Sequence, residues 1–150
     1  DWDHNSRADL IMLDHEGYLA LFRRIENDLT GTGERVFKTE GPSSFDRRGN
    51  PLDLISNALR LNTDRAGMSG RRKFAIVDWD GDGALDLIVN STCVDWFRNI
   101  EGIYRYEGPL CETQLGGHTT SPTTVDWNGD GIRDLLIGTE DGFLYYREGR

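Results

Sequence analysis

The chain has 150 residues, of which 37% are hydrophobic and 10% aromatic, so it can bury the core of one ordinary domain. Its 26 acidic and 17 basic residues give a formal net charge of −9, which argues against a nucleic-acid partner because phosphates require a basic surface. No apolar run approaches the roughly 20 residues of a membrane-spanning helix, so we expect no membrane span.

Three segments of the chain repeat one pattern. They read DWDHNSRADLIML from Asp1, DWDGDGALDLIVN from Asp78 and DWNGDGIRDLLIG from Asp126. Each begins with Asp-Trp, has Asp or Asn at the third and fifth positions and Asp at the ninth, and continues directly into an apolar stretch. Internal similarity of this kind indicates a repeat architecture.

The first repeat predicts a β-hairpin. Its apolar run 10–13 ends at the turn Asp-His-Glu-Gly of residues 14–17, and the β-rich run 18–22 follows. A glycine turn between two such runs is typical of a tight hairpin. A further strand is expected at 35–37.

The second and third repeats predict the same unit, now with a strand that precedes the Asp-rich segment at 74–77 and at 123–125. The third repeat has a glycine turn at 139–142, whereas the second has Ser-Thr-Cys at 91–93 in that place. A fourth strand is expected at 103–106.

Four antiparallel strands per repeat form the blade of a β-propeller. The predicted fold class is therefore all-β, with about three blades, some of them incomplete; the best helix candidate, 52–61, is short and marginal. A closed ring needs about four to eight blades, so we expect a fragment or part of a larger propeller. The predicted single segment has repeat 1 at about 1–40, an insertion at about 41–69, repeat 2 at about 70–110 and repeat 3 at about 116–150.

The Asp-rich segments have the chemistry of calcium loops. Oxygen side chains at positions one, three and five of a tight loop can point inward together, and a ninth-position Asp can close the site, which gives the hard ligands that Ca²⁺ prefers. The predicted ligands are Asp1, Asp3, Asn5 and Asp9 in the first loop, Asp78, Asp80, Asp82 and Asp86 in the second, and Asp126, Asn128, Asp130 and Asp134 in the third. Glycines at positions four and six would allow unusual dihedral angles, but the first loop has His4 and Ser6 there.

The loops allow two other interpretations. An EF-hand requires a glutamate at position twelve and flanking helices, whereas Met12, Val89 and Ile137 stand there, so this interpretation fails. The remaining alternative is a set of Asp-Gly turns without metal. The tryptophan at position two of each loop is expected to pack between blades.

The two cysteines, Cys93 and Cys111, suit a disulfide and a pair of buried thiols equally well. The triplet Asn90-Ser91-Thr92 matches the acceptor pattern for N-glycosylation, which also arises by chance.

The stretches FAIVDWDGDGALDLIV (74–89) and TTVDWNGDGIRDLLIGTEDGFLYY (123–146) resemble FG-GAP, or VCBS-type, propeller repeats. Members of this family supply calcium-loaded blades to integrin heads, bacterial surface proteins and carbohydrate-active enzymes. The resemblance implies bound Ca²⁺ and a secreted or cell-surface protein, extracellular or periplasmic. It does not define an activity, because one fold supports many functions.

A narrower resemblance concerns GRRKF (70–74) and GGHTTSP (116–122), which are similar to secreted propeller polysaccharide lyases acting on uronate-containing glycans. It implies β-elimination, with Arg71 and Arg72 holding the uronate carboxylate and His118 as base or acid. The partner would be an acidic polysaccharide or another glycan. Candidates for a further catalytic tyrosine are Tyr18, Tyr104 and Tyr106. The alternatives are an ordinary solvated basic turn at 71–73 and a non-catalytic adhesion or ligand-binding module.

Overall fold

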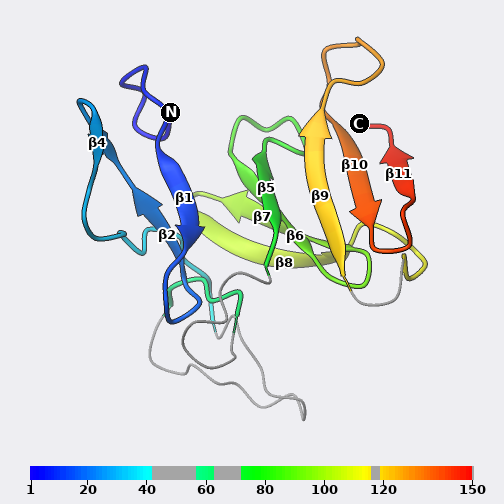
Figure 1. Cartoon of the computed structure of the whole chain (residues 1–150), viewed down its shortest axis with the longest axis horizontal. Coiled ribbons are helices and arrows are strands. Elements are labelled where there is room, and N and C mark those ends of the chain that lie inside the picture. Colours follow the sequence, from blue (N-terminus) through cyan, green and yellow to red (C-terminus); the bar gives the residue numbers. More distant parts are fainter. Residues whose placement is uncertain (42–56, 63–71, 116–118, 150) are drawn as a thin grey trace. The chain divides into compact units, whose positions relative to one another are not determined.

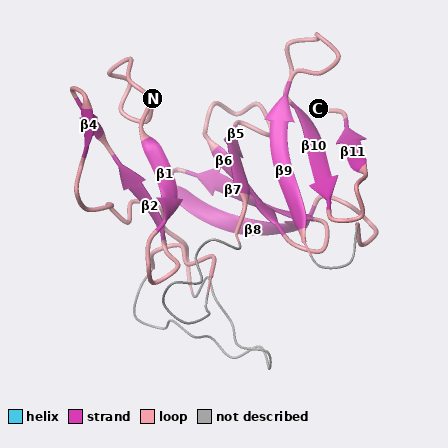
Figure 2. Ribbon diagram, in the orientation of Figure 1, coloured by secondary structure: helices cyan, strands magenta, loops and turns pink. Residues whose placement is uncertain are grey.

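The computed structural model describes residues 1–41, 57–62, 72–115 and 119–149, and the chain folds as two compact units, Asp1–Arg71 and Arg72–Arg150. The described residues form strands, turns and irregular segments without any helix (Figure 2). None of these residues therefore belongs to a helix that could cross a membrane. The all-β prediction is confirmed. The marginal helix candidate at 52–61 forms no helix in its described part, 57–61, where Ala58 and Arg60 form isolated β-bridges.

In the first unit, β1 (Leu10–Leu13) pairs antiparallel with β2 (Leu19–Phe22). Leu13 lies opposite Leu19 at the turn, so the hairpin predicted for the first repeat is confirmed. A short antiparallel ribbon of β3 (Arg24–Ile25) and β4 (Asp28–Leu29) follows. The glycine-containing turn leaves the two longer strands in direct register.

The strand expected at 35–37 is wrong. The residues on either side, Glu34 and Lys38, form only isolated bridges, to Leu21 and Ala58 respectively. Phe37 between them is 1% exposed. This segment contributes a buried aromatic side chain to the core of the first unit and does not extend a β-ladder.

The second unit contains a four-stranded antiparallel sheet, which Figure 1 shows. Its strands are β5 (Phe74–Val77), β6 (Asp86–Asn90), β7 (Val94–Ile100) and β8 (Ile103–Pro109), hydrogen-bonded in chain order. This is the strand order predicted for the second repeat.

A three-stranded antiparallel sheet of the same unit follows in the chain, with the order β11-β10-β9. It consists of β9 (Thr120–Val125), β10 (Asp134–Thr139) and β11 (Leu144–Arg147). Pro122 lies in β9, an edge strand, where its missing N–H removes no ladder bond. Both sheets of this unit are open, so the number of blades and their arrangement in a propeller stay predictions.

One hydrophobic cluster joins the two sheets of the second unit. Its buried members come from β5, from the following loop, from the β6–β7 hairpin and from β10: Val77, Trp79, Ile88, Cys93, Val94, Leu135 and Ile137. Burying a side chain of this size contributes about 1.5–3 kcal/mol. Cys93 also forms a disulfide with Cys111, with the two Cα atoms 6.0 Å apart, which decides between the two states that the sequence left open.

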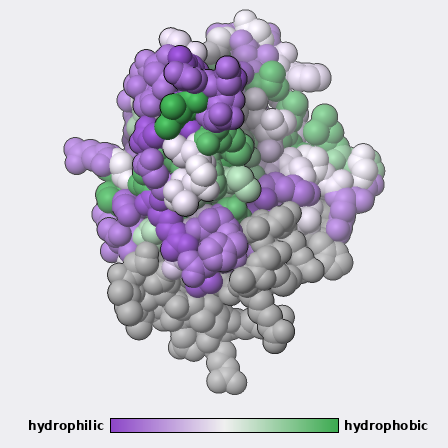
Figure 3. All heavy atoms as spheres, turned by 60° about the vertical axis from the view of Figure 1, so that its left-hand side comes forward, coloured by the Kyte–Doolittle hydropathy of each residue, from purple (hydrophilic) through white to green (hydrophobic). Residues whose placement is uncertain are grey.

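Polar side chains predominate among the described residues on one face of the molecule (Figure 3). Hydrophilic residues cover much of the face in Figure 3, with smaller hydrophobic patches among them. This distribution agrees with a formal net charge of −9.

Candidate metal centre

The three Asp-rich loops, named loop 1 (1–9), loop 2 (78–86) and loop 3 (126–134), share a hydrogen bond across the turn. In each, the carboxylate at position one accepts the backbone N–H of position six, with distances of 3.0 Å for Ser6 to Asp1, 3.0 Å for Gly83 to Asp78 and 2.9 Å for Gly131 to Asp126. This bond curls each loop back onto its first residue. The sequence repeat is thus also a repeat of loop geometry.

The aspartate at position nine ties each loop to its neighbourhood through both oxygens. One oxygen accepts the N–H of the position-two tryptophan, at 2.8 Å from Trp2 to Asp9, 3.3 Å from Trp79 to Asp86 and 2.8 Å from Trp127 to Asp134. The other accepts an N–H from beyond the following hairpin, at 2.8 Å from Arg24, 2.7 Å from Asn99 and 2.9 Å from Gly149. The aspartate at position nine therefore links each loop to the backbone beyond the next hairpin, a structural role that its sequence position alone does not indicate.

Positions four and six of each loop lie in the left-handed backbone region. The φ angles are 75° at Gly81, 89° at Gly83, 79° at Gly129 and 89° at Gly131. The corresponding residues of loop 1, His4 and Ser6, have φ of 58° and 68° without being glycine. Loop 1 thus has the same curvature, but its backbone is strained at His4 and Ser6 because a residue with a Cβ atom is disfavoured in this region.

Carboxylate oxygens converge in loops 1 and 2. Asp1, Asp3 and Asp9 each place one oxygen within 4.8 Å of the others, and so do Asp78, Asp80 and Asp82. In loop 2 the predicted ligands at positions one, three and five are thus brought together. The Asp86 carboxylate, at position nine, is not in this group of three oxygens. It accepts two backbone N–H groups and the Trp96 indole N–H at 3.0 Å.

The surroundings of one carboxylate oxygen in loop 2 suit a bound cation. Asp78 Oδ1 is buried and has no hydrogen-bond partner among the described residues. A buried carboxylate oxygen without a partner is costly unless a donor or a cation compensates it. Burial also raises the pKa of Asp86 above its ordinary value, as expected where negative charges gather in a protected place. The donor set, made of hard oxygens, suits Ca²⁺ better than softer metals.

Loop 3 gathers its polar side chains differently. The Asn128 amide donates to Asp130 Oδ2 at 2.9 Å and to Glu148 Oε1 at 3.3 Å. Asp134 is completely buried, and the backbone N–H of Gly149 lowers its pKa. Glu148 was not among the predicted residues. Its only sequence signal is its position, one residue after β11.

Arginines contact the acidic groups of loops 1 and 2. Arg98 on β7 places Nε 2.5 Å from Asp80 Oδ2 and Nη2 3.1 Å from Asp82 Oδ2. Arg23, directly after β2, places Nη1 3.4 Å from Asp3 Oδ2. The backbone N–H of Ala84 and the Arg98 guanidinium lower the pKa of Asp82. These arginines were also missing from the predicted site.

Of the predicted catalytic residues, Arg71 and His118 lie outside the described residues. Arg72 is exposed, and its Nη1 donates to the backbone carbonyl of Asn90 at 3.1 Å. The predicted catalytic set therefore stays a prediction.

The three candidate tyrosines differ in accessibility. Tyr104 is 3% exposed and its hydroxyl donates to the Leu85 carbonyl at 3.0 Å, while burial raises its pKa. Tyr18 is buried beneath the guanidinium of Arg35, which lies 4.0 Å from its ring centroid. Tyr106 is 55% exposed. Only Tyr106 among the three could meet a large substrate without rearrangement.

Asn90 is an unsuitable glycosylation acceptor in the folded chain. Its side chain is buried, with Nδ2 2.5 Å from Thr119 Oγ1 and Oδ1 accepting the Lys73 N–H at 3.0 Å. An attached sugar would require these bonds to break. The match to the acceptor pattern is therefore coincidental in the fold.

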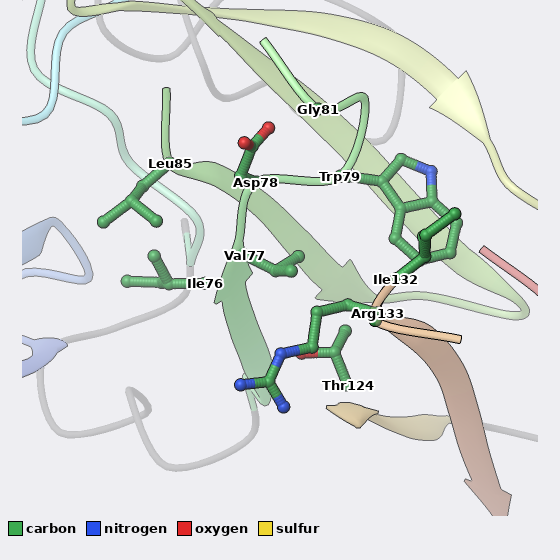
Figure 4. A pocket seen from close by; sticks show the side chains of 10 residues that line it. Ile76, Val77, Asp78, Trp79, Gly81, Leu85, Thr124, Ile132 and Arg133 are labelled. Carbon is green, nitrogen blue, oxygen red and sulfur yellow. The ribbon is translucent and has the colours of Figure 1, made fainter. Parts of the chain in front are cut away.

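A cleft of about 690 Å³ lies beside loop 2 in the second unit (Figure 4). Its lining includes the apolar side chains of Ile76 and Ile132, the Thr124 hydroxyl and the guanidinium of Arg133. Asp78, the first residue of loop 2, also borders it. The cleft combines apolar walls with a few polar groups, as ligand sites commonly do.

The comparison with protein families agrees with the loop geometry and the sheets. The family described as FG-GAP-like repeat matches residues 78–137, from the start of loop 2 into β10. The second unit therefore contains an FG-GAP-like repeat, the class of module that its antiparallel sheets and Asp-rich loops define. No curated protein and no solved structure matches the chain, and nothing in the comparisons supports the narrower resemblance to polysaccharide lyases.

Proposed function

We propose that this chain is a calcium-stabilised, propeller-type binding module of a secreted or cell-surface protein. The observation that carries the proposal is the convergence of three carboxylates in loop 2, one of which has a buried oxygen without a partner. Bound Ca²⁺ would supply positive charge that holds the carboxylates of a loop together. The chain's own residues orient these groups through the backbone hydrogen bonds of positions one and nine.

The disulfide supports an oxidising location. Structural disulfides persist in extracellular and periplasmic proteins, where free calcium is also abundant enough for weak sites. The bond between Cys93 and Cys111 ties the β6–β7 hairpin to the segment after β8. A secreted or surface-exposed protein accounts for both features.

The ligand of such a module is proposed to be a glycan or a protein surface, with the cleft of Figure 4 as the contact region in the second unit. The lyase hypothesis rests on sequence resemblance alone, with Arg71 and His118 outside the described residues. An ultraviolet assay for unsaturated uronate products on acidic polysaccharides tests it, and activity lost in His118→Ala would favour it over the binding module.

Calcium binding is tested best at position five of loop 3. Asp130 Oδ1 accepts the Ile132 N–H at 2.8 Å, and Asp130→Asn retains that oxygen while removing one negative charge. We expect wild-type protein to gain about 2.7 kcal/mol in free energy of unfolding for each site at calcium concentrations 100-fold above its Kd. Asp130→Asn also loses the Oδ2 acceptor of the Asn128 amide, so its melting in calcium is compared with its own melting in chelator. The gain from calcium should be smaller than in wild type, as measured by calorimetry.

Asp141→Asn is the matched control, because Asp141 lies in the following turn and also accepts a backbone N–H, from Phe143 at 3.2 Å. It should retain the full calcium response. Substitutions at Asp86 or Asp134 are less informative, since both accept two or more structural N–H bonds that their loss would remove with or without metal. Equal melting of the wild-type chain in calcium and in chelator would contradict the proposal.

A further inference from the structure

The residue directly across the hairpin from position nine differs among the three repeats. Extending each strand pairing by one residue places Arg23 opposite Asp9, Arg98 opposite Asp86 and Glu148 opposite Asp134. Two loops therefore have a fixed positive charge at this place and the third has a negative one. The loops share the pattern of oxygen side chains but differ in their own charged residues, since loop 3 has Asn128 where loop 2 has Asp80. They differ further in the charge that the neighbouring strand presents to them.

In loop 2 this charge is in direct contact with two predicted ligands. The Arg98 guanidinium lies 2.5 Å from Asp80 and 3.1 Å from Asp82, which occupy positions three and five. The side chains of Asp80 and Asp82 are 21% and 33% exposed. The Arg98 side chain is 38% exposed, so water screens its attraction to the two carboxylates. Of the two contacts, the one from Nη2 to Asp82 is a hydrogen bond. A divalent cation that used the same oxygens would have to displace the guanidinium.

In loop 3 no arginine or lysine among the described residues forms an ion pair with Asp126, Asp130 or Asp134. Glu148 instead shares the Asn128 amide with Asp130. This loop therefore provides an internal reference with the same backbone geometry and no resident cation.

We propose that Arg98 is a resident counter-ion of loop 2 that competes with calcium for Asp80 and Asp82. This inference rests on the proposed calcium function and assigns different affinities to equivalent loops. Loop 2 is held together by Arg98 when calcium is scarce and binds calcium weakly, whereas loop 3 depends on calcium for neutralisation. The chain thereby keeps the second repeat ordered at calcium concentrations that leave loop 3 empty.

The test is a calcium titration of the whole chain followed by ¹H–¹⁵N NMR. The amides of Gly81 and Gly83 report on loop 2, and those of Gly129 and Gly131 report on loop 3. Arg98→Gln should lower the calcium midpoint at Gly81 and Gly83 roughly tenfold, because a competing unit charge in contact with the ligands is removed. The midpoint at Gly129 and Gly131 should not change.

Arg105→Gln is the matched control, since Arg105 lies opposite Arg98 on β8 and its substitution changes the net charge equally. It should leave both midpoints where they are in wild type. If Arg98→Gln does not fold in chelator, Arg98→Lys takes its place in the test. Lysine retains the charge but lacks the planar fork, so the calcium midpoint of loop 2 should fall by a smaller factor than expected for Arg98→Gln.

An unchanged or higher calcium midpoint for loop 2 in these Arg98 variants would overturn the inference while leaving the proposed function in place. Absence of calcium-dependent shifts at both glycine pairs in the wild-type chain would instead overturn the proposed function. The two failures are therefore distinguishable in one experiment.

Discussion

Tryptophan occupies position two of every loop, but its surroundings differ from repeat to repeat. Trp79 is 9% exposed and packs in the cluster that joins the two sheets of the second unit. Trp2 packs against Phe37, with ring centroids 5.1 Å apart. Trp127 is 65% exposed. The expected packing between sheets is thus found for Trp79 and not for Trp127.

The two tryptophans of the second unit therefore predict opposite mutational outcomes. Trp79→Ala should cost about 3–5 kcal/mol in free energy of unfolding, because it removes a large buried side chain and leaves a cavity. Trp127→Ala should change that free energy by less than about 0.5 kcal/mol, as is usual for exposed side chains.

Urea unfolding of both variants in chelator measures these changes without any contribution from bound calcium. Similar losses of stability in the two variants would mean that Trp127 is covered by structure that the described residues do not show. A small effect at Trp79 would contradict the role assigned to the cluster.

At the scale of elements, the second repeat replaces a glycine turn by a covalent link. Ser91-Thr92-Cys93 connects β6 to β7, and Cys93 is joined to Cys111 after β8. Thr120 on β9 adds a hydrogen bond from its hydroxyl to the Cys93 carbonyl. The hairpin is therefore held from both sides although its turn lacks glycine.

Reduction of the disulfide should lower the free energy of unfolding of the second unit by about 3 kcal/mol, the value expected for a loop of this length. The physical reason is that the link restricts the unfolded chain between residues separated by 18 positions. Urea unfolding with and without a reductant measures the change. A Cys93→Ala/Cys111→Ala double variant should not respond to reductant, and a reductant effect of the same size in that variant would rule out the disulfide as its source.

Across the whole molecule, carboxyl groups dominate the charge, and their pKa values depend on local hydrogen bonds. Donors lower six of these pKa values. The Arg35 guanidinium lowers the pKa of Glu16, and at Asp14 burial is outweighed by the same group together with two backbone N–H groups. The other four pKa values are lowered mainly by the N–H of Arg24 for Asp9, the N–H of Ala84 for Asp82, the N–H of Gly149 for Asp134 and the hydroxyl of Thr139 for Asp141. Burial raises the pKa of Asp86 and Asp95. The lowered values outnumber the raised ones.

The metal-free chain should consequently lose stability in acid. A carboxyl with a lowered pKa is still ionised in the folded state at a pH where the unfolded chain, with a pKa near 4, already binds a proton. Its stabilisation is present above about pH 4 and is lost as the pH falls through the lower folded pKa. Asp86 and Asp95 act in the opposite direction, because a raised folded pKa favours the folded state in acid.

Urea unfolding of metal-stripped protein at pH 5, 4 and 3 measures the balance of these groups. A decreasing free energy of unfolding is expected across this series. Stability that stays constant or rises toward about pH 3 would show that Asp86 and Asp95, the two carboxyls with raised pKa values, outweigh the others.

Much of the fold followed from local chemistry. Alternating oxygens, glycines and apolar runs predicted the loops, the β1–β2 hairpin and the strands of the second unit, because the forces involved act between residues close in sequence. The strand expected at 35–37 was wrong. Phe37 is buried, and its carbonyl accepts the N–H of Leu59, which is distant in the sequence, at 2.9 Å. A single sequence shows β-propensity but not the partner of a strand.

The sequence by itself determined the three loops and the residues that each offers to a cation. Tertiary structure decided which charge faces each loop, placing Arg98 against Asp80 and Asp82 and Glu148 beside Asn128. It also decided that Trp79 is buried while Trp127 is exposed. Loop chemistry acts within a few residues of chain, whereas charge neighbours and burial depend on strand register and on the packing of one sheet against the next.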